Sequence, residues 1–370
     1  MTKRLGWLAA LLLLTAGLAL VLLRAEPAQA QKSKDKKKEV WTDPADPTLP
    51  ADFAFQGEYV NCGKGGAYGA QVIALGKGTF QAVVYRGGLP GAGWDGKNKS
   101  LLDGKLDGDT VTFEAAKGVK RKYKSGGLGD FSATRKFPPV GHKVMSGSIS
   151  GMNLTLNAAD DPDIKTPTLT RTDRKNPTMG AKAPEGAIVL FDGTDTKAFT
   201  GGRLDKTTKW LNTDGNDIRT KQKFNDYTVH LEFFEPYRPD ARDQGRGNSG
   251  FYMVDMYEVQ ILDSFGLEGE NNECGGVYTK LKPSVNMCLP PLQWQTYDIT
   301  FTNAVAEDGK TTKNARITAK LTVVVIHDDK EIDGKTGGAR NDAEGTSGPL
   351  QLQGHGNPLQ FRNIWIVEKK

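Results

Sequence analysis

Short stretches of alternating apolar and polar residues, separated by glycine- and aspartate-rich turns, restrict the fold of this chain more than any other feature. In the first half this alternation covers residues 71–75, 79–85, 110–113 and 154–156, with turns at 76–78, 107–109 and 147–151. No stretch there keeps a helical period over three turns. Short, evenly spaced strands of this kind predict an antiparallel meander that forms a small barrel or a sandwich.

The second half carries longer stretches with the same alternation. They cover residues 187–191, 227–234, 249–262, 294–301, 316–326, 349–353 and 361–367. Two long polar loops, 238–248 and 263–288, lie between them. Long loops on a rigid antiparallel scaffold are the usual place for binding residues. We therefore expect an all-β protein whose second half is a sandwich.

The length of 370 residues is enough for two or three ordinary domains. Segments rich in proline, lysine and aspartate separate the expected parts. We predict a signal peptide at 1–30, a lysine-rich tether and linker at 31–50, a small β domain at 51–172, a linker at 173–186 and a β-sandwich domain at 187–370.

The first thirty residues have the pattern of an export signal. Lys3 and Arg4 are followed by the apolar run Trp7 to Leu23 and then by Ala28-Gln29-Ala30, a small-x-small cleavage pattern. An uncleaved membrane anchor is the alternative, because the run approaches spanning length. In both cases the bulk of the chain leaves the cytoplasm, and we expect a periplasmic or secreted protein.

The formal net charge of +5 is confined to the N-terminal segment. Residues 1–30 contribute +2 and residues 31–40 contribute +3, which leaves residues 41–370 neutral. This distribution gives no support for a nucleic-acid partner. We interpret the lysine run as a solvated tether that can also contact anionic lipid or wall polymer.

The chain has three cysteines, Cys62, Cys274 and Cys288. In an oxidising compartment two of them can form a disulfide. Cys274 and Cys288 flank one loop and are the expected pair, which leaves Cys62 over. No C-x-x-C or clustered Cys/His spacing indicates a structural zinc site.

Candidate binding residues emerge when each strand is sorted into two faces. Successive side chains of a strand point to opposite faces. In residues 257–261 the apolar set is Tyr257, Val259 and Ile261, so Glu258 and Gln260 share the other face.

The same sorting applies to residues 350–355. Leu350 and Leu352 are expected in the core, and Gln351, Gln353 and His355 point the opposite way. Carboxylate, amide and imidazole groups on one sheet face suit the hydroxyls of a carbohydrate. The alternative is simple solvation of an outer face.

Other polar residues have weaker patterns. Asn248-Ser249-Gly250 opens a strand and fits a binding residue or an Asx-type turn equally well. His230 is expected to be satisfied at the surface or in the core, and His327-Asp328-Asp329 fits a turn better than a metal site.

Several motifs of the second half, in this order along the chain, resemble the 3-keto-disaccharide hydrolase family. They are Phe191-Asp-Gly193, Asn248-Ser-Gly250, Tyr257 to Asp263, Trp294 to Phe301, Gly348 to Gly356 and Phe361 to Ile366. The resemblance covers about the last half of the chain. It implies a concanavalin A-like jelly-roll sandwich and action on glycosides already oxidised at C3.

The chemistry that the resemblance implies is proton removal at C2, elimination at C1 and hydration. Glu258 is the predicted base and His355 the predicted acid or enolate partner, with the reverse assignment also open. The residues expected to bind hydroxyls or the ketone are Asn248, Gln260, Gln353 and Arg362. A divalent cation can share the enolate charge.

One position departs from the family pattern. Family members often have an Asn-Gly hairpin before the strand that ends in His-Asp, and Thr322-Val323 stands there in this chain. A carbohydrate-binding module without activity is a competing interpretation. A conventional glucanase is another, but it needs two carboxylates, and Glu258 has none at i+2 or i+4 on its strand.

Overall fold

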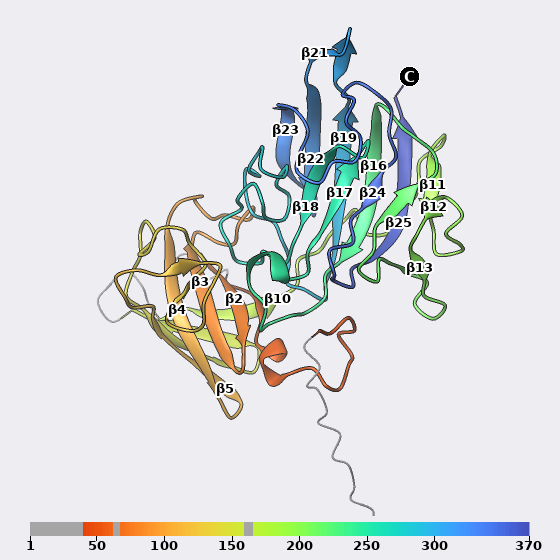
Figure 1. Cartoon of the computed structure of the whole chain (residues 1–370). Coiled ribbons are helices and arrows are strands. Elements are labelled where there is room, and N and C mark those ends of the chain that lie inside the picture. The colour runs from red at the N-terminus through yellow and green to blue at the C-terminus, as the bar shows by residue number, and fades with distance from the viewer. Residues whose placement is uncertain (1–39, 62–66, 159–165, 370) are drawn as a thin grey trace, which may run out of the picture. The chain divides into compact units, whose positions relative to one another are not determined.

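A computed structural model describes residues 40–61, 67–158 and 166–369 of the chain (Figure 1). The predicted signal peptide, residues 31–39 of the tether and Cys62 lie outside the described residues. Within the described ranges no helix is long and apolar enough to cross a membrane.

The first half is a closed antiparallel barrel in the strand order β1-β10-β9-β8-β5-β4-β3-β2. β1 pairs with both β2 and β10, so the sheet closes and no strand edge is left open. Of the two forms that the sequence allowed, the structure is thus the barrel. Its strands are β1 (Gly57–Asn61), β2 (Tyr68–Gly76), β3 (Thr79–Arg86), β4 (Lys99–Asp107), β5 (Thr110–Ala115), β8 (Ser146–Ser150), β9 (Asn153–Asn157) and β10 (Thr168–Thr172).

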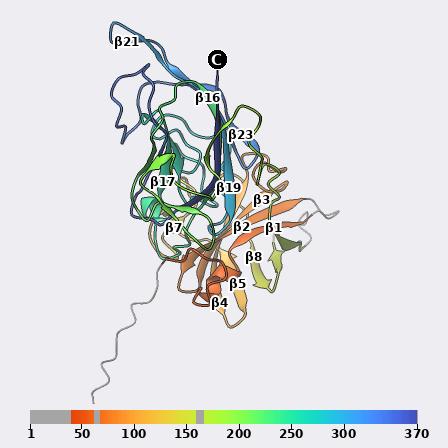
Figure 2. The same cartoon turned by 90° about the vertical axis from the view of Figure 1, so that its right-hand side faces the viewer.

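The second half is a sandwich of two antiparallel sheets, and the predicted all-β jelly-roll class is confirmed. In Figure 2, β17 and β19 lie in its separate layers. The larger sheet holds β11 (Ile188–Phe191), β13 (Arg203–Leu204), β14 (Leu211–Asn212), β16 (Tyr227–Phe234), β19 (Trp294–Thr302), β22 (Ala315–Leu321), β23 (Val324–Ile332) and β25 (Gln360–Glu368). The smaller sheet has the order β12 (Phe199–Thr200), β15 (Ile218–Thr220), β24 (Gln351–Leu352), β17 (Ser249–Met253) and β18 (Tyr257–Ile261).

Short elements complete the described chain. They are the 3-10 helices η1 (Ala51–Ala54) and η2 (Asp243–Gly245), the pair β6 (Lys122–Tyr123) and β7 (Phe131–Ser132), and the hairpin of β20 (Val305–Glu307) and β21 (Lys310–Lys313). The hairpin projects from one end of the sandwich in both views (Figures 1 and 2).

The barrel and the sandwich share one apolar core. Ile73, Val83 and Tyr85 of the barrel are fully or almost fully buried and belong to the same apolar cluster as the side chains between the two sheets. Residues 38–370 accordingly form a single compact unit. The other barrel cluster, which contains Phe80 and Phe113, fills the barrel interior.

Polar contacts from the barrel reach both long loops of the sandwich. Arg242 donates from Nη2 to the backbone oxygen of Leu75 at 2.7 Å, which holds the loop 238–248. Tyr123 donates its hydroxyl to the Glu273 carboxylate, and Lys124 Nζ lies 3.2 Å from Asn272 Oδ1. These two contacts hold the loop 263–288. The barrel therefore supports the two segments in which binding residues were expected.

The segments that precede and follow the barrel are both fixed to the rest of the fold by specific contacts. Ahead of the barrel, Trp41 and Tyr237 of the sandwich exchange a pair of backbone hydrogen bonds, at 3.1 and 2.9 Å. In the segment 173–186, which has no helix or strand, the Arg174 guanidinium binds the Glu58 carboxylate at 2.6 Å. The backbone nitrogen of Gly180 donates to Glu232 at 2.6 Å.

The stretch 316–326, expected as one strand, is broken by a turn. Leu321 pairs with Val324, so Thr322 and Val323 alone connect β22 to β23. Their φ angles are 46° and 66°, the left-handed values that a two-residue type I′ turn needs. Residues with β-branched side chains rarely adopt such angles, so the turn could not be recognised from these two residue types.

We predict that Val323→Gly stabilises the protein. Glycine adopts a positive φ without a steric penalty, and relief of that strain outweighs the entropy that a new glycine adds to the unfolded chain. The expected gain in the free energy of unfolding is about 1 kcal/mol, measured by urea denaturation. Val325→Gly, at the second residue of β23, serves as the control and should destabilise. An equal loss in both variants would contradict the interpretation of this turn.

Candidate active site

The pairing of β17 with β18 sets the geometry of the candidate site. A tight turn joins them, with Met256 donating to the backbone oxygen of Met253 at 3.0 Å. The resulting register places Tyr252 opposite Glu258 and Gly250 opposite Gln260. Tyr257, Val259 and Ile261 point into the core on the other face, as the alternation predicted.

The Glu258 carboxylate is buried, with 3% of the residue exposed. Tyr252 donates its hydroxyl to Oε2 at 2.7 Å. The other oxygen lies over Gly250, because a Cβ built on that glycine would come within 2.3 Å of Oε1. Only a residue without a side chain leaves room for the carboxylate here.

Burial raises the pKa of Glu258 to about 7, against the opposing effect of the Tyr252 hydrogen bond. A carboxyl with this pKa exchanges its proton readily near neutral pH. That is the property required of a general base or acid.

A polar hollow of about 210 Å³ lies over this face of the smaller sheet. It is lined by Gln244, Asn248, Tyr252, Glu258, Gln260, Tyr278, Gly337, Gly338, Gln353 and His355. Five of the six predicted catalytic and binding residues therefore line one hollow, although they come from separate strands and loops. Glu258 is the one carboxylate among these described lining residues.

A set of amide groups forms one wall of the hollow. Asn248 and Gln260 both donate to Gln244 Oε1, at 3.0 and 3.2 Å. Asn248 Oδ1 is buried and has no hydrogen-bond partner among the described residues. A free acceptor of this kind suits a hydroxyl of a bound ligand.

Tyr252 connects the opposite wall to Glu258. Its hydroxyl accepts a hydrogen bond from Gln353 Nε2 at 3.2 Å and has a second possible acceptor, the backbone oxygen of Gly337, at 3.0 Å. A phenol has one proton to donate. The hydroxyl can therefore serve ionised Glu258, or turn to Gly337 when Glu258 is itself protonated.

His355 lies at the exposed rim of the hollow. β24 ends at Leu352, so His355 does not continue the strand as the sorting of faces assumed. The preceding Gly354 packs against backbone atoms of Asn216, and its nitrogen donates to Asp217 at 2.9 Å. The segment that carries His355 is thus anchored directly before the imidazole.

The position of Arg362 corrects its predicted role as a substrate ligand. It lies on β25 of the larger sheet, where Nε binds the Glu232 carboxylate at 2.6 Å and the guanidinium stacks 4.1 Å from the Trp294 ring centre. It is not among the residues that line the hollow. The sequence pattern did not reveal which sheet would receive the last strand.

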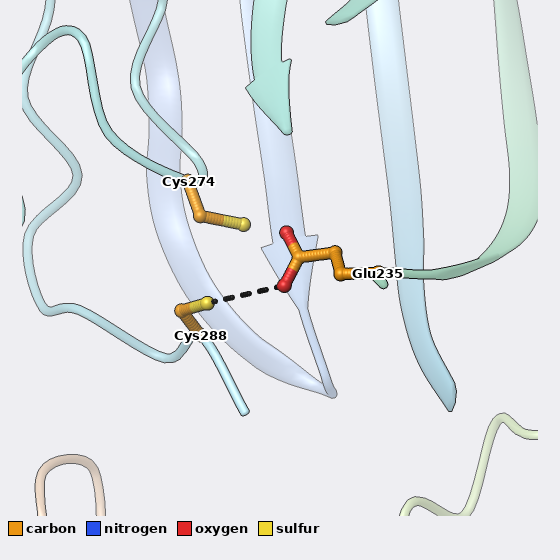
Figure 3. A group of neighbouring side chains, drawn as sticks. All are labelled: Glu235, Cys274 and Cys288. Carbon is orange, nitrogen blue, oxygen red and sulfur yellow. Dashed lines mark hydrogen bonds between the residues drawn. The ribbon is translucent and has the colours of Figure 1, made fainter. Parts of the chain in front are cut away.

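The predicted disulfide is also corrected. Cys274 and Cys288 are buried free thiols in the structure. The carboxylate of Glu235, a residue that follows β16, lies beside both sulfur atoms (Figure 3). The short distance between the two cysteines along the chain did indicate that they would be neighbours. It did not indicate that Glu235 would lie beside them.

His230 is satisfied in the core, as expected. It is fully buried, stacks on Trp365 and binds Asp298 through Nδ1 at 2.6 Å. Burial lowers the pKa of His230, but the Asp298 and Glu232 carboxylates outweigh this effect and raise it to about 9. Protonated His230 is therefore part of the folded core and does not line the hollow.

Sequence reasoning missed Tyr252, Gln244 and Tyr278. Tyr252 could have been found, since it alternates with Phe251 and Met253 and so belongs to the polar face. Gln244 and Tyr278 lie in the long loops, and their positions depend on loop conformation. That conformation leaves no periodic signal in the sequence.

Comparison with known proteins shows the family of the C-terminal half. The model of the 3-keto-alpha-glucoside-1,2-lyase-like domain matches residues 186–367. The chain also has 36% sequence identity over 85% of a protein of known structure from Parabacteroides distasonis ATCC 8503, described as a candidate glycosyl hydrolase. The C-terminal half of this chain belongs to that family. It is a carbohydrate-active domain of the glycosyl hydrolase type.

The similarity to the Parabacteroides protein covers 50% of this chain and has a TM-score of 0.47. Two further candidate glycosyl hydrolases from the same organism are 18% and 19% identical. Each covers 50% of this chain, with 95% and 99% of its own chain aligned and TM-scores of 0.37 and 0.35. No match is found among curated proteins.

We predict that Tyr252→Phe raises the pKa of Glu258 further above 7. The hydroxyl stabilises the ionised carboxylate, so its removal favours the protonated form. An NMR titration of protein carrying carbon-13 in the glutamate carboxyl groups measures the shift. Tyr257→Phe is the matched control, because that hydroxyl donates to Glu344 and should leave Glu258 unchanged. A lowered pKa in Tyr252→Phe would contradict the assigned hydrogen bond.

Proposed function

We propose that the C-terminal domain cleaves glycosides whose sugar carries a ketone at C3. The observation that carries this proposal is Glu258, a buried carboxyl with a pKa of about 7 in a polar hollow that also contains His355. The family description supports the same substrate class. A sugar with a C3 ketone needs a base of moderate strength, because the ketone acidifies the C2 proton.

The proposed reaction is an elimination followed by hydration. Glu258 takes the C2 proton, and electrons from the broken C2–H bond form the enolate of the C3 ketone. The C1–O bond then breaks, and the leaving oxygen takes a proton from His355. Water next adds its hydroxyl to C1 and gives its other proton to His355, while Glu258 returns its proton to C2 of the enone, which gives hydrolysis as the net result.

Glu258 is the better base of the two because it is buried beside the amide wall, whereas His355 is exposed at the rim. A rim position suits contact with the departing group, which extends towards solvent. The reverse assignment, with His355 as base, predicts a different pH profile. In that case an ionised Glu258 would not be required for turnover.

Neutral hydrogen-bonding groups around Glu258 suit the enolate and the sugar hydroxyls. Gln353 and Tyr252 can direct their donors to the ketone oxygen as negative charge develops there. Asn248 and Gln260 lie on the other wall and can hold hydroxyls. A divalent cation bound there would find Glu258, His355 and amide oxygens as ligands and would add charge that stabilises an enolate.

A conventional glucanase is less well supported than the elimination. Its mechanism needs a pair of carboxylates about 5–9.5 Å apart across the scissile bond. The described lining of the hollow offers Glu258 alone. A carbohydrate-binding module is the second candidate, because the same amide-rich face could bind an unoxidised glycan without turnover.

We also propose that the protein works outside the cytoplasm, with a carbohydrate as its partner. The signal-like pattern of residues 1–30 and the lysine run that follows support this location. The lysines would keep the protein near an anionic envelope surface.

Glu258→Gln should lower the release of aglycone from a 3-keto-glucoside at least about 100-fold, the range expected on loss of a general base. Wild-type activity should rise with pH through about 7 as Glu258 ionises. The rate is measured on 3-keto and ordinary glucosides side by side, with and without a chelator. Glu307→Gln, on the exposed β20 hairpin, is the matched control.

Folding of the variant is checked by its stability. The pKa of Glu258 is about 7 in the folded chain and near 4.5 when exposed, so its ionisation destabilises the fold as pH rises from 4.5 through 7. Glu258→Gln should therefore be at least as stable as wild type at pH 8. Undiminished turnover by this variant would remove Glu258 as the base. Binding of an unoxidised glycan without turnover of either glucoside would favour the binding module.

A further inference from the structure

Three potential metal ligands meet in the interior of the sandwich, away from the hollow. One carboxylate oxygen of Glu235 and the Sγ atoms of Cys274 and Cys288 all lie within 4.8 Å of one another. Figure 3 shows the carboxylate pointing towards both sulfur atoms. All three residues are at most 1% exposed. Among the described residues this is the one group of three or more such ligands.

The Glu235 carboxylate lacks a compensating partner. Oε1 is buried and has no hydrogen bond within the described chain. Oε2 accepts from Gln295 Nε2 at 3.2 Å and lies 3.8 Å from the Cys288 sulfur. The nearby Arg246 is already paired with Asp263, at 2.8 Å. A buried acid without a cation is costly to the fold unless it stays protonated or binds a metal.

We propose that Glu235, Cys274 and Cys288 form a structural zinc site. Two thiolates and a carboxylate suit zinc, which binds sulfur at about 2.3 Å and carboxylate oxygen at about 2.0–2.2 Å. On binding, both thiols and the carboxyl release their protons to solvent. The backbone oxygens of Leu289 and Leu262 lie 3.4 and 3.5 Å from the Cys288 sulfur and are the candidates for a fourth ligand.

The groups around the cluster fit a metal centre of this kind. Gln295 orients the carboxylate through Nε2, while its Oε1 accepts from the backbone of Leu289 at 2.8 Å. The Tyr297 hydroxyl lies 3.4 Å from the Cys274 sulfur. Such outer contacts fix the orientation of metal ligands. Full burial leaves no open position for a substrate, so the role is structural.

The three residues of the cluster connect distant parts of the chain. Glu235 follows the end of β16, and Cys274 and Cys288 are the two ends of the segment 274–288. Next to Cys274, Gly275 and Gly276 exchange backbone hydrogen bonds with Gln260 of β18, at 3.0 and 2.9 Å. The same segment carries Tyr278, which lines the hollow. A zinc ion here would fasten this segment behind the strand that carries Glu258 and Gln260.

A disulfide between the two cysteines is the competing state. Oxidation would join the sulfur atoms but leave the Glu235 carboxyl buried without a partner. Zinc satisfies all three groups at once, which is why the geometry favours the metal.

The test is metal analysis of the whole exported chain, purified without chelator from zinc-containing medium. We expect about one zinc per chain by elemental analysis, a native mass that includes the ion, and two thiols that become reactive only when zinc is released. Refolding with Co²⁺ should give the absorption of a thiolate–cobalt centre. Zinc-free folded protein after refolding in excess zinc would overturn the proposal. So would an intact mass lower by two hydrogen atoms with no reactive thiol at 274 or 288.

Glu235→Gln and Cys288→Ser should each lower the zinc content at least tenfold. Cys62→Ser is the matched control and should keep it. If the first two variants fail to fold, the metal content of the wild type still decides the question. An unchanged zinc content in folded Glu235→Gln and Cys288→Ser would overturn the assignment of the ligands.

Discussion

The candidate site depends on one register, the pairing of β17 with β18. It sets Gly250 beneath the Glu258 carboxylate and Tyr252 opposite it. A slip of β18 by one residue against β17 would turn Glu258 into the core and away from Tyr252, since strand faces alternate. The short turn at Val254 and Asp255, with φ angles of 49° and 57°, holds this register. A feature of backbone geometry thus determines whether a carboxyl can be buried in this position.

The barrel contributes to this site by supporting loops. The hydrogen bond of Arg242 to Leu75 links the barrel to the loop that carries Gln244. The hydrogen bond of Tyr123 to Glu273 links it to the loop that carries Tyr278. Loops of that length lose conformational entropy when they order. The barrel holds these two loops in place, and the amide-rich wall of the hollow can therefore form from loop residues. This arrangement gives the barrel a physical role in the candidate site.

The sequence predicted the β class, most strands and the polar face, because alternation with a period of two is a local signal. Glu258, Gln260 and Gln353 were found in this way. Arg362 was misplaced because strand order is not local, and Tyr278 was missed because loop conformation is not periodic. The zinc ligands that we propose come from two distant segments, so Glu235 had no visible link to Cys274 and Cys288. The break at Thr322 and Val323 was indicated by the hairpin of the family pattern alone, because these two residue types rarely adopt a left-handed backbone.

The reciprocal hydrogen bonds of Trp41 and Tyr237 also have a mechanical consequence. They are the first described attachment of the chain to the folded body, and Tyr237 directly precedes the loop that carries Gln244. Traction applied to the chain ahead of Trp41 would therefore load the edge of the sandwich next to the hollow before it reached any barrel strand. Force on the chain and ligand binding would then act on the same loop.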